Sequence, residues 1–193
     1  MRRRFCLPVL LLAPVLAGCF DISETLEVSR DGEAQFVLTA AFERALYPTP
    51  QSQRDAEQDC QATDDPSGAG LTVSRRSLWS DAAFICAVTV RTTDWPALTA
   101  KRLAGMTLTK AGPRQFRFAV DLAGTSKDAS LTTGQSFKGH RWTVLVRALD
   151  IVDTNGTVAP DHKSVTWETP MAAVFDATTP APEKSFWVVA RYR

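Results

Sequence analysis

Residues 25–42 of the chain read TLEVSRDGEAQFVLTAAF. Two β-rich runs with alternating apolar positions flank a central Arg30-Asp31-Gly32-Glu33. An Asp-Gly pair between such runs is a strong signal of a β-hairpin, because glycine accepts the backbone angles that a tight turn needs. The sequence therefore predicts a pair of antiparallel strands near the start of the folded region.

The same alternation recurs further along the chain. Phe116, Phe118 and Val120 point one way along residues 115–122, while Gln115, Arg117 and Asp121 point the other way. This pattern is typical of an antiparallel strand with one buried face. Further strands are expected over residues 71–76, 83–91, 106–110, 141–149, 164–168 and 186–193.

Two segments differ from the strands. A helix is expected over residues 95–104, because Asp94 can cap its start and Gly105 follows its end. Residues 43–70 contain three prolines and few large apolar groups, which indicates a loop-rich surface excursion with at most a short helix over residues 52–59. We therefore expect one α+β domain, mainly antiparallel β-sheet with one or two helices.

The first eighteen residues are expected to be a cleaved export signal. Three consecutive arginines precede an apolar run over residues 7–16, which as a helix would be about 15 Å long against a bilayer core of about 30 Å. The run ends in Leu16-Ala17-Gly18-Cys19, which resembles the bacterial lipoprotein box. That resemblance implies cleavage after residue 18, lipid chains on Cys19, and a single lipid-anchored domain over residues 19–193.

The export signal also sets the expected location and redox state. We expect the domain to lie in the bacterial cell envelope and to face the periplasm. Its expected partner is the membrane, to which the lipid anchor attaches it. Phe20 stands where an aspartate would retain a lipoprotein in the inner membrane, which favours the outer membrane. In this oxidising compartment Cys60 and Cys86 are expected to form a structural disulfide.

Charge is unevenly distributed along the chain. Residues 20–70 hold 3 basic and 11 acidic side chains, residues 71–147 hold 12 and 4, and residues 148–193 hold 4 and 6. One interpretation is a cationic face that binds an anionic lipid or envelope polymer. The alternative is cross-strand pairing of these cations with acids such as Glu27. The candidate ligand-binding residues are Arg75, Arg76, Arg91, Lys110, Arg114 and Arg117.

The sequence offers little for catalysis or metal binding. His140 and His162 are the two histidines, and no Gly-x-Ser-x-Gly motif is present. Asp153-Thr154-Asn155-Gly156 matches the middle of a calcium loop, but Ile151 and His162 occupy ligand positions, so a type I′ Asn-Gly turn is favoured. We expect no enzyme activity, catalytic residue, metal or cofactor, and the near-neutral composition indicates no nucleic-acid partner.

Three features together resemble the LppM-like family of bacterial lipoproteins. They are the Gly18-Cys19 start, the hairpin that opens with residues 26–32, and the Asn155-Gly156 turn that leads to Val165-Thr166-Trp167. The resemblance implies an extracytoplasmic α+β lipoprotein domain, for which lipid or glycolipid binding has been suggested. It carries over no catalytic residues.

Two functions are compatible with these features. The leading hypothesis is a non-enzymatic, lipid-anchored envelope lipoprotein that binds a lipid, a glycolipid or another anionic envelope component. The alternative is a structural or assembly subunit of an envelope protein complex with no small ligand. A concave apolar pocket would favour the first, and a solid core with a flat exposed aromatic patch the second.

Overall fold

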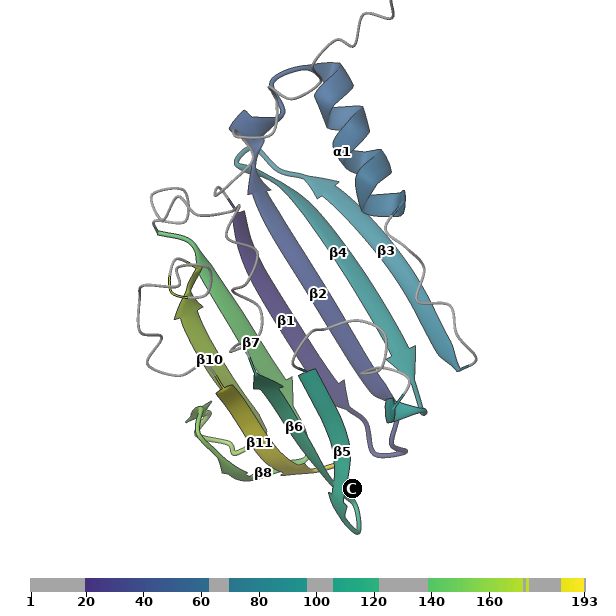
Figure 1. The fold of residues 1–193 in the computed structure, drawn as a ribbon, viewed down its shortest axis with the longest axis vertical. Coiled ribbons are helices and arrows are strands. Elements are labelled where there is room, and N and C mark those ends of the chain that lie inside the picture. Colours follow the sequence, from purple (N-terminus) through teal and green to yellow (C-terminus); the bar gives the residue numbers. More distant parts are fainter. Residues whose placement is uncertain are drawn as a thin grey trace, which may run out of the picture.

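A computed structural model of the protein describes residues 20–62, 70–96, 106–121, 139–171, 173 and 185–192. The export signal, Cys19 and most of the helix expected over residues 95–104 lie outside these ranges. Within them the protein is an α+β structure built mainly from antiparallel strands, as the sequence predicted (Figure 1). No helix of this described part is long and apolar enough to cross a bilayer.

The larger of two sheets has seven strands in the order β3-β4-β2-β1-β7-β10-β9. Neighbouring strands are antiparallel except β1 and β7, which run parallel. The bounds of these strands are β1 (Phe20–Val28), β2 (Ala34–Glu43), β3 (Leu71–Trp79), β4 (Ala83–Thr92), β7 (Arg141–Arg147), β9 (Thr157–Val158) and β10 (Ser164–Pro170).

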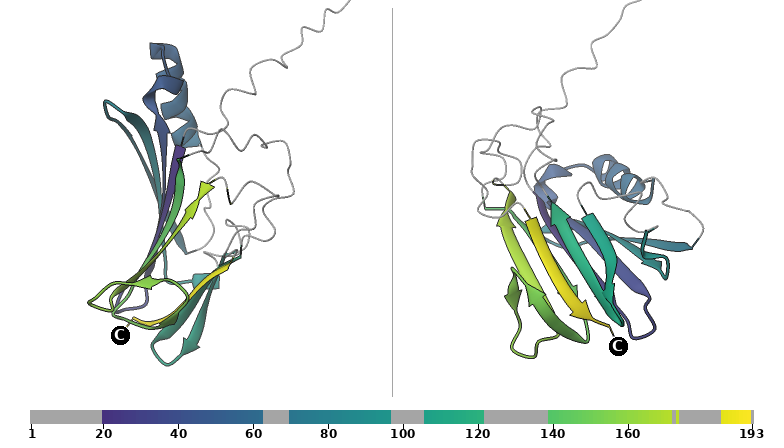
Figure 2. Two further views of the ribbon diagram at one scale, coloured as in Figure 1. Left: turned by 90° about the vertical axis from the view of Figure 1, so that its left-hand side faces the viewer. Right: turned by 60° about the horizontal axis from the view of Figure 1, so that its bottom comes forward.

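The smaller sheet has four antiparallel strands in the order β5-β6-β11-β8. It lies against one face of the larger sheet (Figure 2). Its strands are β5 (Met106–Gly112), β6 (Gln115–Asp121), β8 (Asp150–Thr154) and β11 (Ser185–Arg191). The main core fills the space between the sheets, and its fully buried side chains include Leu26, Val144, Val146, Val165, Phe116, Phe118 and Val188. The alternation of residues 115–122 thus predicted the buried side correctly.

The hairpin of β1 and β2 has the predicted position. Val28 pairs with Ala34 across the turn, and the Gly32 N–H donates to the Ser29 carbonyl at 3.1 Å. Gly32 has φ +88°, a left-handed conformation that glycine adopts without the steric cost of a Cβ. The Asp-Gly signal therefore identified this hairpin for the right physical reason.

The α-helix α1 (Pro50–Ala62) follows the short 3₁₀-helix η1 (Arg44–Leu46). This helix occupies much of the segment that the sequence predicted to be loop-rich, and it is longer than the short helix expected there. Ala56 and Cys60 of α1 pack on Phe84 of β4, which faces the same side as the core residue Val88 because strand side chains alternate. The helix thus covers one end of the face whose other end carries the smaller sheet (Figure 1).

A disulfide joins Cys60 of α1 to Cys86 of β4, as the sequence predicted. The two cysteines are 26 positions apart in the chain. The bridge fastens the helix to the larger sheet, where the small core around Ala56, Cys60 and Phe84 supplies few buried side chains of its own.

The Asn155-Gly156 segment is not the type I′ hairpin turn that the sequence favoured. β8 before it belongs to the smaller sheet and β9 after it to the larger one. A type I′ turn needs positive φ at both central residues, and neither Asn155 nor Gly156 is among the described residues with positive φ. This segment is a corner where the chain crosses from one sheet to the other.

Candidate functional site

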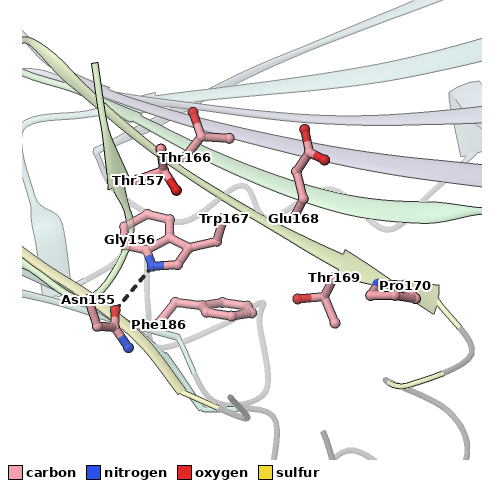
Figure 3. A pocket seen from close by; sticks show the side chains of 9 residues that line it. All are labelled: Asn155, Gly156, Thr157, Thr166, Trp167, Glu168, Thr169, Pro170 and Phe186. Carbon is pink, nitrogen blue, oxygen red and sulfur yellow. Dashed lines mark hydrogen bonds between the residues drawn. The ribbon is translucent and has the colours of Figure 1, made fainter. Parts of the chain in front are cut away.

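A cleft of about 410 Å³ opens along β10 and reaches β11 and the corner between the sheets (Figure 3). Its volume is within the range of known small-molecule sites, which begins at about 300 Å³. The cleft is lined by Asn155, Gly156, Thr157, Thr166, Trp167, Glu168, Thr169, Pro170 and Phe186.

Two aromatic side chains form the floor of this cleft. The rings of Trp167 and Phe186 lie 5.9 Å apart between centroids with 32° between their planes. Both residues are almost fully buried, with 5% and 3% of their surface exposed. Behind them Trp142 meets Phe186 edge-on, with ring centroids 6.0 Å apart. The floor is therefore an apolar surface held in place by neighbouring rings.

Asn155 positions the walls of the cleft. Its Oδ1 accepts hydrogen bonds from the Trp167 indole N–H at 3.0 Å and from the Trp187 backbone N–H at 2.9 Å. Its Nδ2 donates to the Ser185 carbonyl at 2.8 Å. One amide thus joins the corner to a strand of each sheet, and its bonds to protein groups give it a structural role.

The backbone at Gly156 does not need a glycine, because its φ lies outside the left-handed region. Close packing is what excludes a side chain at this position. A Cβ at this position would lie 2.5 Å from two atoms of the Trp167 indole and 2.6 Å from a Val165 methyl. The indole can therefore lie flat against the corner only because residue 156 has no side chain. The two neighbouring residues of the Asn-Gly motif thus support the same aromatic ring.

The rim of the cleft is polar. It carries the hydroxyls of Thr157 and Thr166 and the carboxylate of Glu168. Glu168 pairs with Arg141 at 2.6 Å, and because both side chains are more than half exposed this ion pair contributes little to stability. Among described residues, β9 pairs with β10 at Val165 and Thr166 alone, so the rest of this edge of β10 has no strand beside it.

A buried acid lies behind the floor. Glu24 of β1 is 5% exposed, and it faces the same side as Leu26 because strand side chains alternate. Desolvation by burial raises the pKa of Glu24 from 4.5 to about 7, and the nearby Trp142 indole has a smaller, lowering effect on this pKa. Within the described residues, neither Glu24 Oε2 nor Trp142 Nε1 has a hydrogen-bond partner of normal geometry.

Sequence reasoning missed Glu24, although a signal was present. Ile22, Glu24, Leu26 and Val28 alternate along β1, so the strand that the hairpin predicts places a carboxyl in an otherwise apolar row. An acid in such a row is a candidate for a raised pKa.

The six predicted cations do not share one face. Arg75 of β3 pairs in register with the core residue Val88 and is half-buried on the core side. Arg76 and Arg91 are exposed on the opposite side of the same sheet, where Arg91 donates to Gln35 Oε1 at 2.7 Å. This half of the set therefore lies on two sides of the larger sheet.

The remaining predicted cations belong to the smaller sheet. Lys110 is near the end of β5, and Arg114 lies in the turn before β6. Arg117 of β6 places its guanidinium 5.3 Å from the centre of the Trp187 ring. None of the six lines the aromatic cleft. The structure thus does not gather these six cations into one cationic face.

The histidines occupy structural positions. His140 Nδ1 lies 3.3 Å from Asp21 Oδ1, and its Nε2 is 3.9 Å from Glu43 Oε1. His162 is an exposed turn residue with φ +57°. The part of the chain that the structure describes contains no group of three His, Cys, Asp or Glu side chains arranged to hold a metal ion.

The architecture defines the class of this protein as a two-sheet α+β domain with mainly antiparallel strands. No family model matches the chain, and no curated protein matches it. Among solved structures, it is similar to the NMR structure of the folded domain of LppM from Mycobacterium tuberculosis, with a TM-score of 0.50, 15% identity and 91% of each chain covered. At this identity the similarity shows the fold, and it agrees with the fold that the family resemblance implied.

Proposed function

We propose that this protein is a lipid-anchored lipoprotein of the bacterial cell envelope that binds a lipid or glycolipid without catalysing a reaction. The lipoprotein-like Gly18-Cys19 sequence supports the anchor. The similarity of the fold to a mycobacterial LppM domain is consistent with an envelope location. The observation that carries the binding proposal is the cleft with an aromatic floor.

The chemistry of the cleft suits an amphipathic ligand. An acyl chain could lie against the apolar floor formed by Trp167 and Phe186. Hydroxyls of a sugar or glycerol head group could exchange hydrogen bonds with Thr157 and Thr166 at the rim. This division into an apolar floor and a few polar groups is the common design of small-molecule sites.

The position of the cleft supports access from the anchoring membrane. Ile22 of β1 pairs with Trp142 of β7, and Trp142 pairs with Thr169 of β10. Thr169 therefore lies about 10 Å from β1, two strand spacings away, and close to the residue that follows the predicted lipid on Cys19. A lipid leaving that membrane would reach this end of the domain first.

The experiment is mass spectrometry of organic extracts from the full-length protein purified in detergent. A lipid in addition to the covalent anchor should co-purify. Thr157→Trp places a large ring on the cleft lining and should reduce the extracted lipid about tenfold, as expected for loss of about 1.4 kcal/mol of binding. Thr72→Trp is the matched control, because Thr72 is exposed on β3. Equal lipid in both variants would contradict the assignment of the cleft.

A second candidate function is assembly within an envelope complex. The edge of β10 favours it, because the described residues place no strand beside most of this edge, and an unpaired strand edge can accept a strand from another chain. An extract without lipid, together with cross-links from this edge to a partner protein, would favour assembly over lipid binding.

A further inference from the structure

A second cleft, of about 330 Å³, lies at the other end of the strands that form the first. Val28 and Arg147, which line it, are the last residues of β1 and β7. The nine-residue β1 separates it from Phe20 by about 27 Å. It is lined by Glu27, Val28, Ser29, Arg30, Arg147, Ala148, Leu149, Lys163 and Tyr192.

Three cations from three separate segments meet at this cleft. Arg30 is in the turn after β1, Arg147 ends β7, and Lys163 directly precedes β10. Their proximity follows from strand pairing, since Glu27 is in register with Arg147, and Arg147 with Ser164. All three cationic side chains are exposed. Positions this far apart in the sequence gave no local signal of a cluster.

No described ion pair joins the local acids to these three cations. Glu27 is the one carboxylate on the lining, and no ion pair joins it to a cation in the described part of the chain. Asp31 in the adjacent turn accepts a hydrogen bond from the Ser29 hydroxyl. Asp150 pairs with Arg191 at 3.2 Å. The lining therefore carries an excess of two positive charges.

The backbone around the cleft is already hydrogen-bonded. The Ala148 N–H donates to the Lys163 carbonyl and the Leu149 N–H to the Arg191 carbonyl, each at 2.9 Å. The Lys163 N–H donates to Asp161 Oδ1 at 3.0 Å. A ligand would thus be recognised by the side chains, and a concave surface with a net positive charge attracts an anion.

We propose that Arg30, Arg147 and Lys163 form a binding site for a phosphoryl group. Guanidinium groups offer paired N–H donors that match two phosphate oxygens, and the lysine ammonium adds a third charge. The Tyr192 ring on the wall of the site packs against Trp95, with ring centroids 5.3 Å apart. This site is separate from the aromatic cleft and does not depend on the proposed function.

The phosphoryl group has two possible sources, a soluble phosphorylated molecule or a lipid head group. The test uses the full-length lipidated protein anchored in phosphatidylcholine nanodiscs. Inorganic pyrophosphate is titrated into the nanodiscs to probe the soluble source. Co-sedimentation of the nanodiscs with phosphatidylglycerol vesicles probes the head-group source, and phosphatidylcholine vesicles give the background.

The decisive variant is Arg147→Gln with Lys163→Gln. Its matched control is Arg76→Gln with Lys110→Gln, which removes the same charge from two exposed positions outside the cleft. We expect the site variant to bind the probe about tenfold or more weakly than the unmodified protein does. The control variant should change the affinity by less than about twofold. Loss of pyrophosphate binding identifies a soluble ligand, and loss of vesicle binding alone identifies a head group.

A variant that binds more tightly is also tested, because misfolding can weaken binding but cannot strengthen it. Glu27→Gln removes the one carboxylate on the lining and should strengthen binding about threefold, a modest effect because the charge is exposed to solvent. Equal effects of the site and control variants, or no binding of either probe by the unmodified protein, would overturn the proposal. Thr157→Trp should leave binding of either probe unchanged, which separates this site from the lipid cleft.

Discussion

The two clefts lie at opposite ends of the same central strands but are built in opposite ways. The aromatic cleft rests on buried rings, a glycine with no room for a side chain, and an asparagine bonded to three neighbouring groups. The cationic cleft rests on exposed side chains of Arg30, Arg147 and Lys163, around backbone groups that are already hydrogen-bonded to one another.

Stability and binding are therefore expected to be coupled at one end and separable at the other. A change to the buried end alters packing that the fold needs, so the free energy of unfolding and binding should change together. A change to the exposed cations removes charge but little packing, so binding should change while stability remains.

The largest expected effect comes from Glu24, behind the aromatic floor. Because burial raises its pKa from 4.5 to about 7, the folded state holds this proton more tightly than the unfolded state. The contribution of Glu24 to stability is therefore most favourable below pH 4.5 and is lost as the pH rises through about 7. That loss amounts to about 3 kcal/mol at high pH.

Glu24→Gln should remove this pH dependence. Urea unfolding at about pH 5 and about pH 8 would measure it: between these two conditions the unmodified protein should lose about 2.5 kcal/mol more of its free energy of unfolding than the variant. Glu27→Gln on the exposed side of the same strand is the matched control. Parallel stability curves for Glu24→Gln and the unmodified protein would show that the carboxyl is not desolvated.

The second largest effect on stability is expected at Gly156, in the corner between the sheets. Gly156→Ala should lower the free energy of unfolding by about 2 kcal/mol, because its Cβ overlaps the buried indole of Trp167. Extracted lipid should fall with it, since the indole forms the floor. Pyrophosphate binding by the folded protein should not change.

Gly112→Ala supplies the control for that substitution. A Cβ at Gly112 would meet the flexible Gln115 side chain at 3.6 Å, an ordinary contact. Its stability should stay within about 0.5 kcal/mol of the unmodified protein. Equal destabilisation by both alanines in thermal unfolding would mean that the corner has room to relax.

Local patterns explain why the strands could be predicted from sequence. The alternation in residues 115–122 and the Asp-Gly of the first hairpin depend on neighbours along the chain. β8 was missed because Ile151 is its one buried residue, which leaves no alternation to detect. β9, with two residues, is too short to show a pattern.

The candidate sites depend on contacts between distant segments and were harder to predict. The Asn155-Gly156 and Thr166-Trp167 motifs did mark one wall of the aromatic cleft, but the turn type was wrong because the chain changes sheets there. The middle segment is rich in cations, yet the cluster around the second cleft takes Arg30 and Lys163 from outside it. Only the pairing of β1, β7 and β10 brings these side chains together.

The smallest effect should come from the cations themselves. Arg147→Gln with Lys163→Gln should change the free energy of unfolding by less than about 0.5 kcal/mol. Any change should be a gain at low salt, because the two side chains have no described counterion and repel one another, and salt should abolish the gain by screening. Urea unfolding at low and high salt measures this. A loss of stability as large as that of Gly156→Ala would mean that the cationic end is also part of the packed structure, and the contrast between the clefts would fail.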